Sequence, residues 1–147
     1  MKKFPACRYI CLVFALTAFG GWGCSEARNS PDSLAQNTPA VQHLSVEEVY
    51  QILQNQPDAM VIDVRTQEEF SGPLGHIAGA QLKPVQEMQT WAAQIDSLKD
   101  EQIILICRTV NRSGKAAEYL RSRGFTNLVA VQGGMVEWNN KGYPVEK

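Results

Sequence analysis

The sequence has few cysteines outside its first 24 residues and lacks a C-x-x-C pair. Its 147 residues include cysteines at positions 7, 11, 24 and 107. Thioredoxin-like redox chemistry and a disulfide framework are both unsupported by this distribution. No cluster of metal ligands and no phosphate-binding P-loop is present in the sequence. The sequence therefore predicts neither a metal nor another cofactor.

The chain also lacks an excess of charge of one sign. Lys and Arg total 14 and Asp and Glu total 15, which gives a formal net charge of −1. No global charge favours nucleic acid as a partner. Hydrophobic residues make up 44% and charged residues 20%, as in globular proteins. The length suffices for one ordinary domain.

The N-terminal segment has the features of an export signal. Lys2, Lys3 and Arg8 precede an apolar run over residues 9–19, and small residues follow. A basic start, an apolar core of this length and small residues at the cleavage site define a secretory signal. A membrane-spanning helix would need about 18–20 apolar residues. We therefore predict a signal peptide over residues 1–23.

The end of this signal, Gly21-Trp22-Gly23-Cys24, resembles the lipobox of bacterial lipoproteins. In that family a small residue precedes a cysteine that receives a lipid and becomes the mature N-terminus. The resemblance implies an exported protein of the bacterial periplasm or cell envelope, lipid-anchored at Cys24. Ser25 favours the outer membrane over the inner one. Ordinary cleavage nearby, which would release a free protein, is the alternative, because Gly21 and Trp22 depart from the usual pattern.

Cleavage before Cys24 would change both the charge and the cysteine count. It removes three positive charges from a net charge of −1, which leaves −4, and it removes Cys7 and Cys11. If Cys24 carries a lipid, Cys107 has no partner within the chain. A solitary thiol outside the cytoplasm is unusual, because those compartments oxidise thiols. Cys107 is therefore either a small buried hydrophobic residue or a functional one.

Composition divides the mature chain into a tether and a domain. Residues 24–43 are polar, contain two prolines and have no hydrophobic period, which predicts a flexible linker. From Leu44 the pattern changes, and we assign residues 44–147 to one compact domain. Ser45 followed by Glu48 predicts a capping box at the start of a helix.

Short apolar runs alternate with helical patterns throughout this domain. Strands are predicted at residues 60–64, 103–106 and 128–131, and helices over residues 46–53, from Pro84, over residues 113–123 and over about 135–140. Gly124 is expected to end the third helix. This alternation predicts an α/β domain with a mainly parallel sheet flanked by helices on both faces.

Polar or glycine-rich segments follow all three predicted strands. Asp63 and Arg65 end the first strand, residues 107–113 follow the second, and Gly133-Gly134 follows the third. In open α/β sheets, ligands bind beyond the carboxyl ends of the strands. We therefore expect these segments to lie together and to form the functional site.

The segment after the second strand has the features of an anion-binding loop with a reactive cysteine. A loop that curls into a helix can aim successive backbone N–H groups at an anion. A sulfur at its centre is then held as thiolate, the nucleophilic form. Cys107 is the candidate nucleophile. The candidate substrate-binding residues follow it: Arg108, Thr109, Val110, Asn111 and Arg112.

Basic residues cluster in and after this loop. Between positions 108 and 123 they are opposed only by Glu118: Arg108, Arg112, Lys115, Arg121 and Arg123. In a mature chain of net negative charge, we expect a local positive island that attracts a small anion. Arg121 and Arg123 fit a solvated helix face, whereas Arg112 lies inside the loop and is the functional candidate.

Other polar residues near the loop are predicted to support it. Asp63 and Arg65 are expected to tie the loop region together through hydrogen bonds or an ion pair. Ser113 is expected to cap the helix that follows the loop. His76 is expected to be a structural histidine, because a thiolate activated by the loop needs no separate base.

Several segments, in their order and spacing, resemble the rhodanese or sulfurtransferase family. The markers are VIDVR (61–65), Glu69-Phe70, GHIAGA (75–80), CRTVNRS (107–113), GGMVEW (133–138) and GYPV (142–145). The resemblance implies a single rhodanese-like domain in which Cys107 carries a persulfide cradled by the amides of residues 108–112. It implies sulfur transfer from a small anionic donor such as thiosulfate to a thiol or cyanide, without a cofactor. The only membrane contact would be the N-terminal lipid.

Two other functions are alternatives to sulfur transfer. A phosphatase or arsenate reductase of this fold is opposed by the C-x4-R spacing of Cys107 and Arg112, because phosphatases of this group have a loop one residue longer. A non-catalytic module that binds an anion or a protein is favoured by Val110, where the family commonly has Gly. If that position needs a positive φ, a β-branched residue is strained there. The intact Cys107 and Arg112 favour the enzyme.

Overall fold

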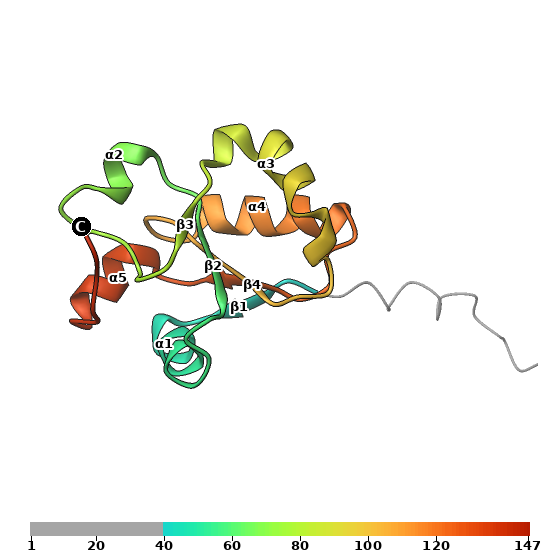
Figure 1. Ribbon diagram of the computed structural model, residues 1–147. Helices are drawn as coiled ribbons and strands as arrows, with labels where there is room; N and C mark the ends of the chain where they lie inside the picture. Colours follow the sequence, from blue (N-terminus) through green and yellow to red (C-terminus); the bar gives the residue numbers. More distant parts are fainter. Residues whose placement is uncertain (1–39) are drawn as a thin grey trace, which may run out of the picture. The chain divides into compact units, whose positions relative to one another are not determined.

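The computed structural model describes residues 40–147, and the strands of this part form one sheet (Figure 1). The strands are β1 (Gln42–Leu44), β2 (Met60–Asp63), β3 (Gln81–Leu82), β4 (Ile103–Ile106) and β5 (Leu128–Val131). Their order across the sheet is β1-β5-β4-β2-β3, and all neighbouring pairs run parallel. The predicted α/β class with a parallel sheet is confirmed.

Helices cover both faces of this sheet. They are α1 (Val46–Asn55), α2 (Gln67–Phe70), α3 (Met88–Gln94), α4 (Asn111–Ser122) and α5 (Gly134–Asn140), with 3-10 turns η2 (Val85–Glu87) and η3 (Asp96–Leu98) beside α3. Side-chain packing places α3 and α4 on one face and α1 and α5 on the other. Crossover connections of this kind are what neighbouring parallel strands require.

The central strand β4 is buried on both faces, as its uninterrupted apolar sequence predicts. Ile103 and Leu105 pack with α3 and α4, whereas Ile104 and Ile106 pack with α1 and α5. Burial of an aliphatic side chain of this size contributes about 1.5–3 kcal/mol. Burial on both faces therefore fixes the position of the strand, and with it the start of the following segment at Cys107.

Two helix ends follow their sequence signals. Ser45 and Glu48 form the predicted capping box at the start of α1, in which the Glu48 carboxylate accepts a hydrogen bond from the Ser45 N–H at 2.8 Å. After α4, Gly124 has a φ of +92°, which glycine adopts without steric cost. Phe125 follows and is buried, as expected for the residue after such a cap.

Several boundaries differ from those predicted. β1 begins at Gln42 and pairs with β5, so the last residues of the predicted linker 24–43 belong to the sheet. The helical pattern that starts at Pro84 is divided into η2, α3 and η3. Helix α4 begins at Asn111 rather than at Ser113. The short elements β3 and α2 were not predicted, because each has too few residues to show a period.

The part of the chain that the structure describes contains no helix long and apolar enough to cross a membrane. The predicted signal peptide, residues 1–23, and the predicted lipidation site at Cys24 lie outside the described residues, as does most of the predicted linker. These three predictions are therefore not tested by the fold.

Candidate active site

The polar ends of β2, β4 and β5 meet at one edge of the sheet, as predicted. Asp63 ends β2 and is paired in register with Ile106, the residue before Cys107. After β5, Gly133 is the N-cap of α5 and Gly134 is its first residue. Because the strands run parallel, their carboxyl ends lie together, and this is where α/β sheets bind ligands.

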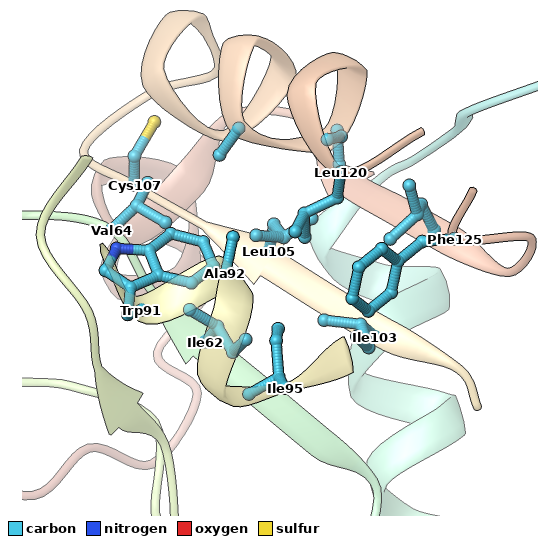
Figure 2. Packing of buried hydrophobic residues seen from close by; sticks show 14 residues of the cluster. Ile62, Val64, Trp91, Ala92, Ile95, Ile103, Leu105, Cys107, Leu120 and Phe125 are labelled. Atoms are coloured by element: carbon cyan, nitrogen blue, oxygen red, sulfur yellow. The ribbon is translucent and has the colours of Figure 1, made fainter. Parts of the chain in front are cut away.

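Cys107 begins the connection between β4 and α4, with 1% of its surface exposed. Figure 2 shows the side chain at one end of a core cluster, near Val64 and Trp91, with the sulfur directed away from the indole ring. The Sγ atom lies 3.5 Å from the Oγ atom of Ser113 in α4. Apolar packing therefore holds one side of the cysteine and leaves the sulfur beside the polar start of the helix.

The N-terminal turn of α5 orients the peptide groups of the loop. The carbonyl oxygen of Cys107 accepts a hydrogen bond from the N–H of Met135 at 2.9 Å, and that of Arg108 from the N–H of Val136 at 3.1 Å. In a trans peptide the N–H points opposite to the carbonyl group. The N–H groups of Arg108 and Thr109 are therefore directed away from α5.

A series of backbone N–H groups without a hydrogen-bond acceptor directly follows Cys107. Within the described part of the chain, those of residues 108–113 donate to no acceptor. The first hydrogen bond of α4 is donated by Gly114 to the carbonyl oxygen of Val110 at 2.9 Å. Successive open N–H groups at a helix N-terminus form an anion site, to which the helix dipole adds positive potential. This arrangement can stabilise a thiolate or a persulfide anion.

Val110 does not need the backbone conformation that favours glycine. Its φ is −149°, outside the positive range that favours glycine. The sequence-based expectation that a β-branched residue is strained at this position does not apply. The observation that favoured a non-catalytic binding module therefore loses its support.

Ser113 does not cap α4, and that prediction is wrong. It lies in the first turn, is fully buried, and its hydroxyl donates to the carbonyl oxygen of Val110 at 3.0 Å. Val110 occupies the N-cap position and provides no side-chain hydrogen bond. A polar cap would occupy N–H groups that this loop leaves open, so its absence suits a helix end that binds an anion.

The side chain of Arg112 forms a two-point ion pair with Glu69. Nη1 lies 2.5 Å from Oε2, and Nη2 lies 2.7 Å from Oε1. The hydrogen bonds from Arg112 lower the pKa of Glu69 to about 2, and Glu69 in turn raises the pKa of Arg112. The guanidinium group that was predicted to bind substrate is thus engaged by a carboxylate of this chain.

Two neighbours hold Glu69 in place. Thr66 and Glu69 form a capping box at the start of α2. The Nη1 atom of Arg65 donates to the carbonyl oxygen of Glu69 at 3.0 Å. The position of the Arg112 side chain therefore depends on a helix from a distant part of the sequence.

Asp63 and Arg65 form the predicted ion pair, and both are fully buried. Nε and Nη2 of Arg65 donate to the carboxylate at distances of 2.6–2.9 Å. Nη2 also donates to the carbonyl oxygen of Gly75 at 2.6 Å. The pair therefore braces residues 69–75, and its link to the cysteine loop runs through Glu69 rather than being direct.

The predicted positive island is smaller than the sequence suggests. Three of its members have carboxylate partners: Arg112, Arg121 and Arg123 pair with Glu69, Glu118 and Asp96. Glu69 and Asp96 come from segments far from the island, which is why the sequence did not reveal them. Arg108 and Lys115 are exposed and make no ion pair with the described residues.

The sequence also predicted roles for several other polar side chains. The ring of His76 stacks on Phe70 with centroids 3.7 Å apart, and its Nδ1 atom lies 3.2 Å from the carbonyl oxygen of Phe70, contacts that fit the predicted structural role. Thr109 and Asn111 are exposed, and their side chains make no hydrogen bond to residues 40–147, so their role in substrate binding stays a prediction. The described residues include no group of three or more His, Cys, Asp or Glu side chains that could hold a metal ion.

A buried cysteine at the end of a central parallel strand, followed by open amides at a helix N-terminus, defines a class of α/β domain with a cysteine at an anion-binding loop. Residues 45–141 match the family model of the rhodanese-like domain. The chain belongs to the rhodanese-like domain family.

Proteins of similar sequence or structure support this assignment. The uncharacterized protein YqhL of Bacillus subtilis is 37% identical over 83 residues, 56% of this chain and 63% of that protein. A sulfurtransferase of Allochromatium vinosum is 28% identical over 105 residues, 71% of this chain and 94% of that protein. The crystal structure of a rhodanese-like domain protein from Staphylococcus aureus has a TM-score of 0.60 and 29% identity, and the match covers 73% of this chain and 100% of that one.

The relatives differ in what they do and in length. A tRNA uridine(34) hydroxylase of Photorhabdus laumondii is 31% identical over 104 residues, 68% of this chain. The chain spans less than two thirds of the length of several relatives that it matches, 63% of YqhL and 29% of this hydroxylase.

Two contributors to the site were not expected from the sequence. Glu69 is the partner of Arg112, and the capping signal Thr66-x-x-Glu69 could have located the start of its helix. The N–H groups of Met135 and Val136 orient the loop, and the preceding pair of glycines was the available signal for a close backbone approach.

Proposed function

We propose that this protein is a sulfurtransferase that moves a sulfane sulfur from a donor such as thiosulfate to a thiophilic acceptor through a persulfide on Cys107. The observation that carries this proposal is the set of open N–H groups of residues 108–113 beside the sulfur. Family membership and the sulfurtransferase among the relatives support it.

The reaction proceeds by double displacement. The Cys107 thiolate attacks the sulfane sulfur of thiosulfate, the sulfur–sulfur bond of the donor breaks, and sulfite leaves with the bonding electron pair. A persulfide anion stays on Cys107, and the backbone N–H groups stabilise its charge. A thiol or cyanide then takes the outer sulfur and regenerates the thiolate. The described residues hold no second cysteine, so an outside acceptor removes the sulfur.

The test is to incubate the purified protein with thiosulfate and to measure its intact mass. The mass should rise by one sulfur atom, and cyanide should then restore it and yield thiocyanate. Cys107→Ser should abolish both. Gain of sulfur without thiocyanate formation would indicate a carrier, and hydrolysis of a phosphate ester without sulfur gain would overturn the assignment in favour of a phosphatase.

We also propose that the protein is exported to the periplasm or cell envelope and anchored by a lipid on Cys24. The basic, apolar and small-residue order of residues 1–23 supports this. The chain enters the domain at β1, where Gln42 pairs with Val129 of β5. Palmitate labelling that is lost in Cys24→Ala is the expected result, and a protein that takes no label would exclude the anchor.

A further inference from the structure

We propose that Glu69 is a positioning residue that sets the donor specificity of the sulfur-transfer site. It holds Arg112 in an ion pair, and the site therefore favours organic hydropersulfides over the dianion thiosulfate. This inference rests on the proposed sulfur transfer and names the class of donor.

The ion pair engages both terminal nitrogens of the Arg112 guanidinium group. Two of its N–H-bearing nitrogens, Nη1 and Nη2, donate to the two carboxylate oxygens of Glu69 in parallel. Such two-point pairs between Arg and a carboxylate are among the strongest hydrogen-bonded contacts in proteins. A donor that binds Arg112 in the same way would have to displace Glu69.

Glu69 is not free to move aside. Its backbone carbonyl accepts a hydrogen bond from Arg65, which is itself buried against Asp63. Its carboxylate also accepts from the N–H of Thr66 at 3.3 Å. The carboxylate has a pKa of about 2 because Arg112 donates to it, so it is ionised at every pH at which the enzyme would work.

The charge count at the site distinguishes the two classes of donor. With thiosulfate, a thiolate meets a dianion, and the Cys107 persulfide anion and sulfite together carry the same three negative charges. With a hydropersulfide R–S–S–H, the thiolate attacks the terminal sulfur and R–S⁻ leaves with the electron pair. The proton stays on the new Cys107–S–S–H group, and the reacting atoms carry a single negative charge throughout.

The positive charge left for a donor is small once Arg112 is paired. Arg108 and Lys115 are both exposed, so water and salt screen their charge. The open N–H groups of residues 108–113 provide partial charges, enough for one anionic sulfur at the helix end. A donor that adds no negative charge at its reacting end matches this site better than a dianion does.

The test compares single-turnover loading of Cys107 in the full chain by thiosulfate and by cysteine hydropersulfide, followed by intact mass. The variant is Glu69→Gln, which keeps the capping box but cannot hold Arg112 as an ion pair. Loading efficiency with thiosulfate should rise about five-fold, and that with the hydropersulfide should change by less than about two-fold. The gain with thiosulfate should shrink as salt is added.

Glu68→Gln is the matched control. It removes the same charge from the neighbouring position of α2, and the exposed Glu68 side chain makes no ion pair with the described residues. It should leave the loading efficiency unchanged with both donors. A Glu69→Gln protein that loses loading equally with both donors, or loses it with thiosulfate alone, would overturn the inference. Failure of both donors to load the unaltered protein would instead overturn the proposed function.

A double variant keeps the test valid if Glu69→Gln folds poorly. Glu69→Gln combined with Arg112→Gln removes both charges of the pair and leaves no unpaired charge behind. If Arg112 is neutralised in the native site, the ratio of thiosulfate to hydropersulfide loading should stay within about two-fold of the native ratio. A selective fall with thiosulfate would show that Arg112 binds the donor directly and would contradict the inference.

Discussion

Gly134 lies so close to the backbone of Cys107 that no side chain fits between them. A Cβ atom on Gly134 would be 2.5 Å from the carbonyl oxygen of Cys107 and equally close to that of Thr109. This contact brings the first N–H groups of α5 onto the loop carbonyls. The glycine therefore permits the contact that directs the N–H groups of Arg108 and Thr109 away from α5.

Substitution of Gly134 by alanine should displace the loop. The φ of this residue is +56°, so alanine would be strained there in addition to the clash. We expect a loss of about 2–4 kcal/mol in the free energy of unfolding, together with at least about a ten-fold loss of sulfur loading, since misplaced catalytic groups have effects of that order. Urea denaturation and intact mass after thiosulfate treatment measure the two effects.

Gly142→Ala is the control for backbone strain alone. Gly142 has a φ of +70°, and a Cβ atom there would meet nothing within 4 Å. This variant should lose about 1 kcal/mol of stability and keep its loading rate. Equal losses of loading in both variants would show that the contact with the loop has no special importance.

The hydroxyl group of Ser113 lies near both a loop carbonyl oxygen and the Cys107 sulfur. Its proton can point to the Val110 carbonyl oxygen at 3.0 Å or to the Cys107 sulfur at 3.5 Å. A charged sulfur is the stronger acceptor, so the hydroxyl should turn to it when the thiolate forms. Ser113→Ala should therefore slow alkylation of Cys107 by iodoacetamide about three- to ten-fold near neutral pH.

Ser122→Ala is matched to this variant. Its hydroxyl makes the same kind of bond, to the carbonyl oxygen of Tyr119 at 2.7 Å, but at the far end of α4. It should leave the alkylation rate unchanged. An alkylation rate in Ser113→Ala equal to that of the unaltered protein would mean that backbone amides alone support the thiolate.

Much of the fold could be predicted from the sequence, because its signals are local. The runs at residues 103–106 and 128–131 are apolar without interruption, which is the mark of strands covered on both faces. The position of Cys107 at a strand end followed from the same pattern. The capping box at Ser45 needs only a residue three positions away.

The rest of the site depends on residues that meet only in the folded chain. Glu69 and Arg112 are 43 positions apart, and no local rule pairs them. The start of α4 was misplaced for a different reason: Ser113 has the chemistry of a cap, but a helix end that is left open for an anion violates the capping rule. Deviations of this kind are expected at functional sites.

The buried pair of Asp63 and Arg65 should be important for stability. Both side chains are fully buried, and removal of one charge leaves the other without compensation. Asp63→Asn should therefore lower the free energy of unfolding by about 3–5 kcal/mol. Urea denaturation measures this loss. Glu118→Gln breaks the exposed pair with Arg121 and should lose no more than about 0.5 kcal/mol. Similar losses in the two variants would contradict the difference in burial.

The ion pair of Glu69 should make stability depend on pH in a defined window. Its pKa is lowered from 4.5 to about 2 by Arg112. A carboxylate with a lowered pKa in the folded state stabilises the fold fully above its unfolded pKa and loses this effect as the pH falls toward the folded value. The difference in unfolding free energy between the native protein and Glu69→Gln should therefore be constant above about pH 5 and shrink toward about pH 2.

The size of this difference should be about 1–2 kcal/mol, less than the pKa change implies, because the pair is partly open to water. Urea unfolding of both proteins between about pH 7 and pH 3 measures it. Glu68→Gln, one position earlier in α2, should show no comparable step. A difference that stays constant down to about pH 3 would show that the contact between Glu69 and Arg112 does not act through charge, because an ionic contact must weaken as the carboxylate is protonated.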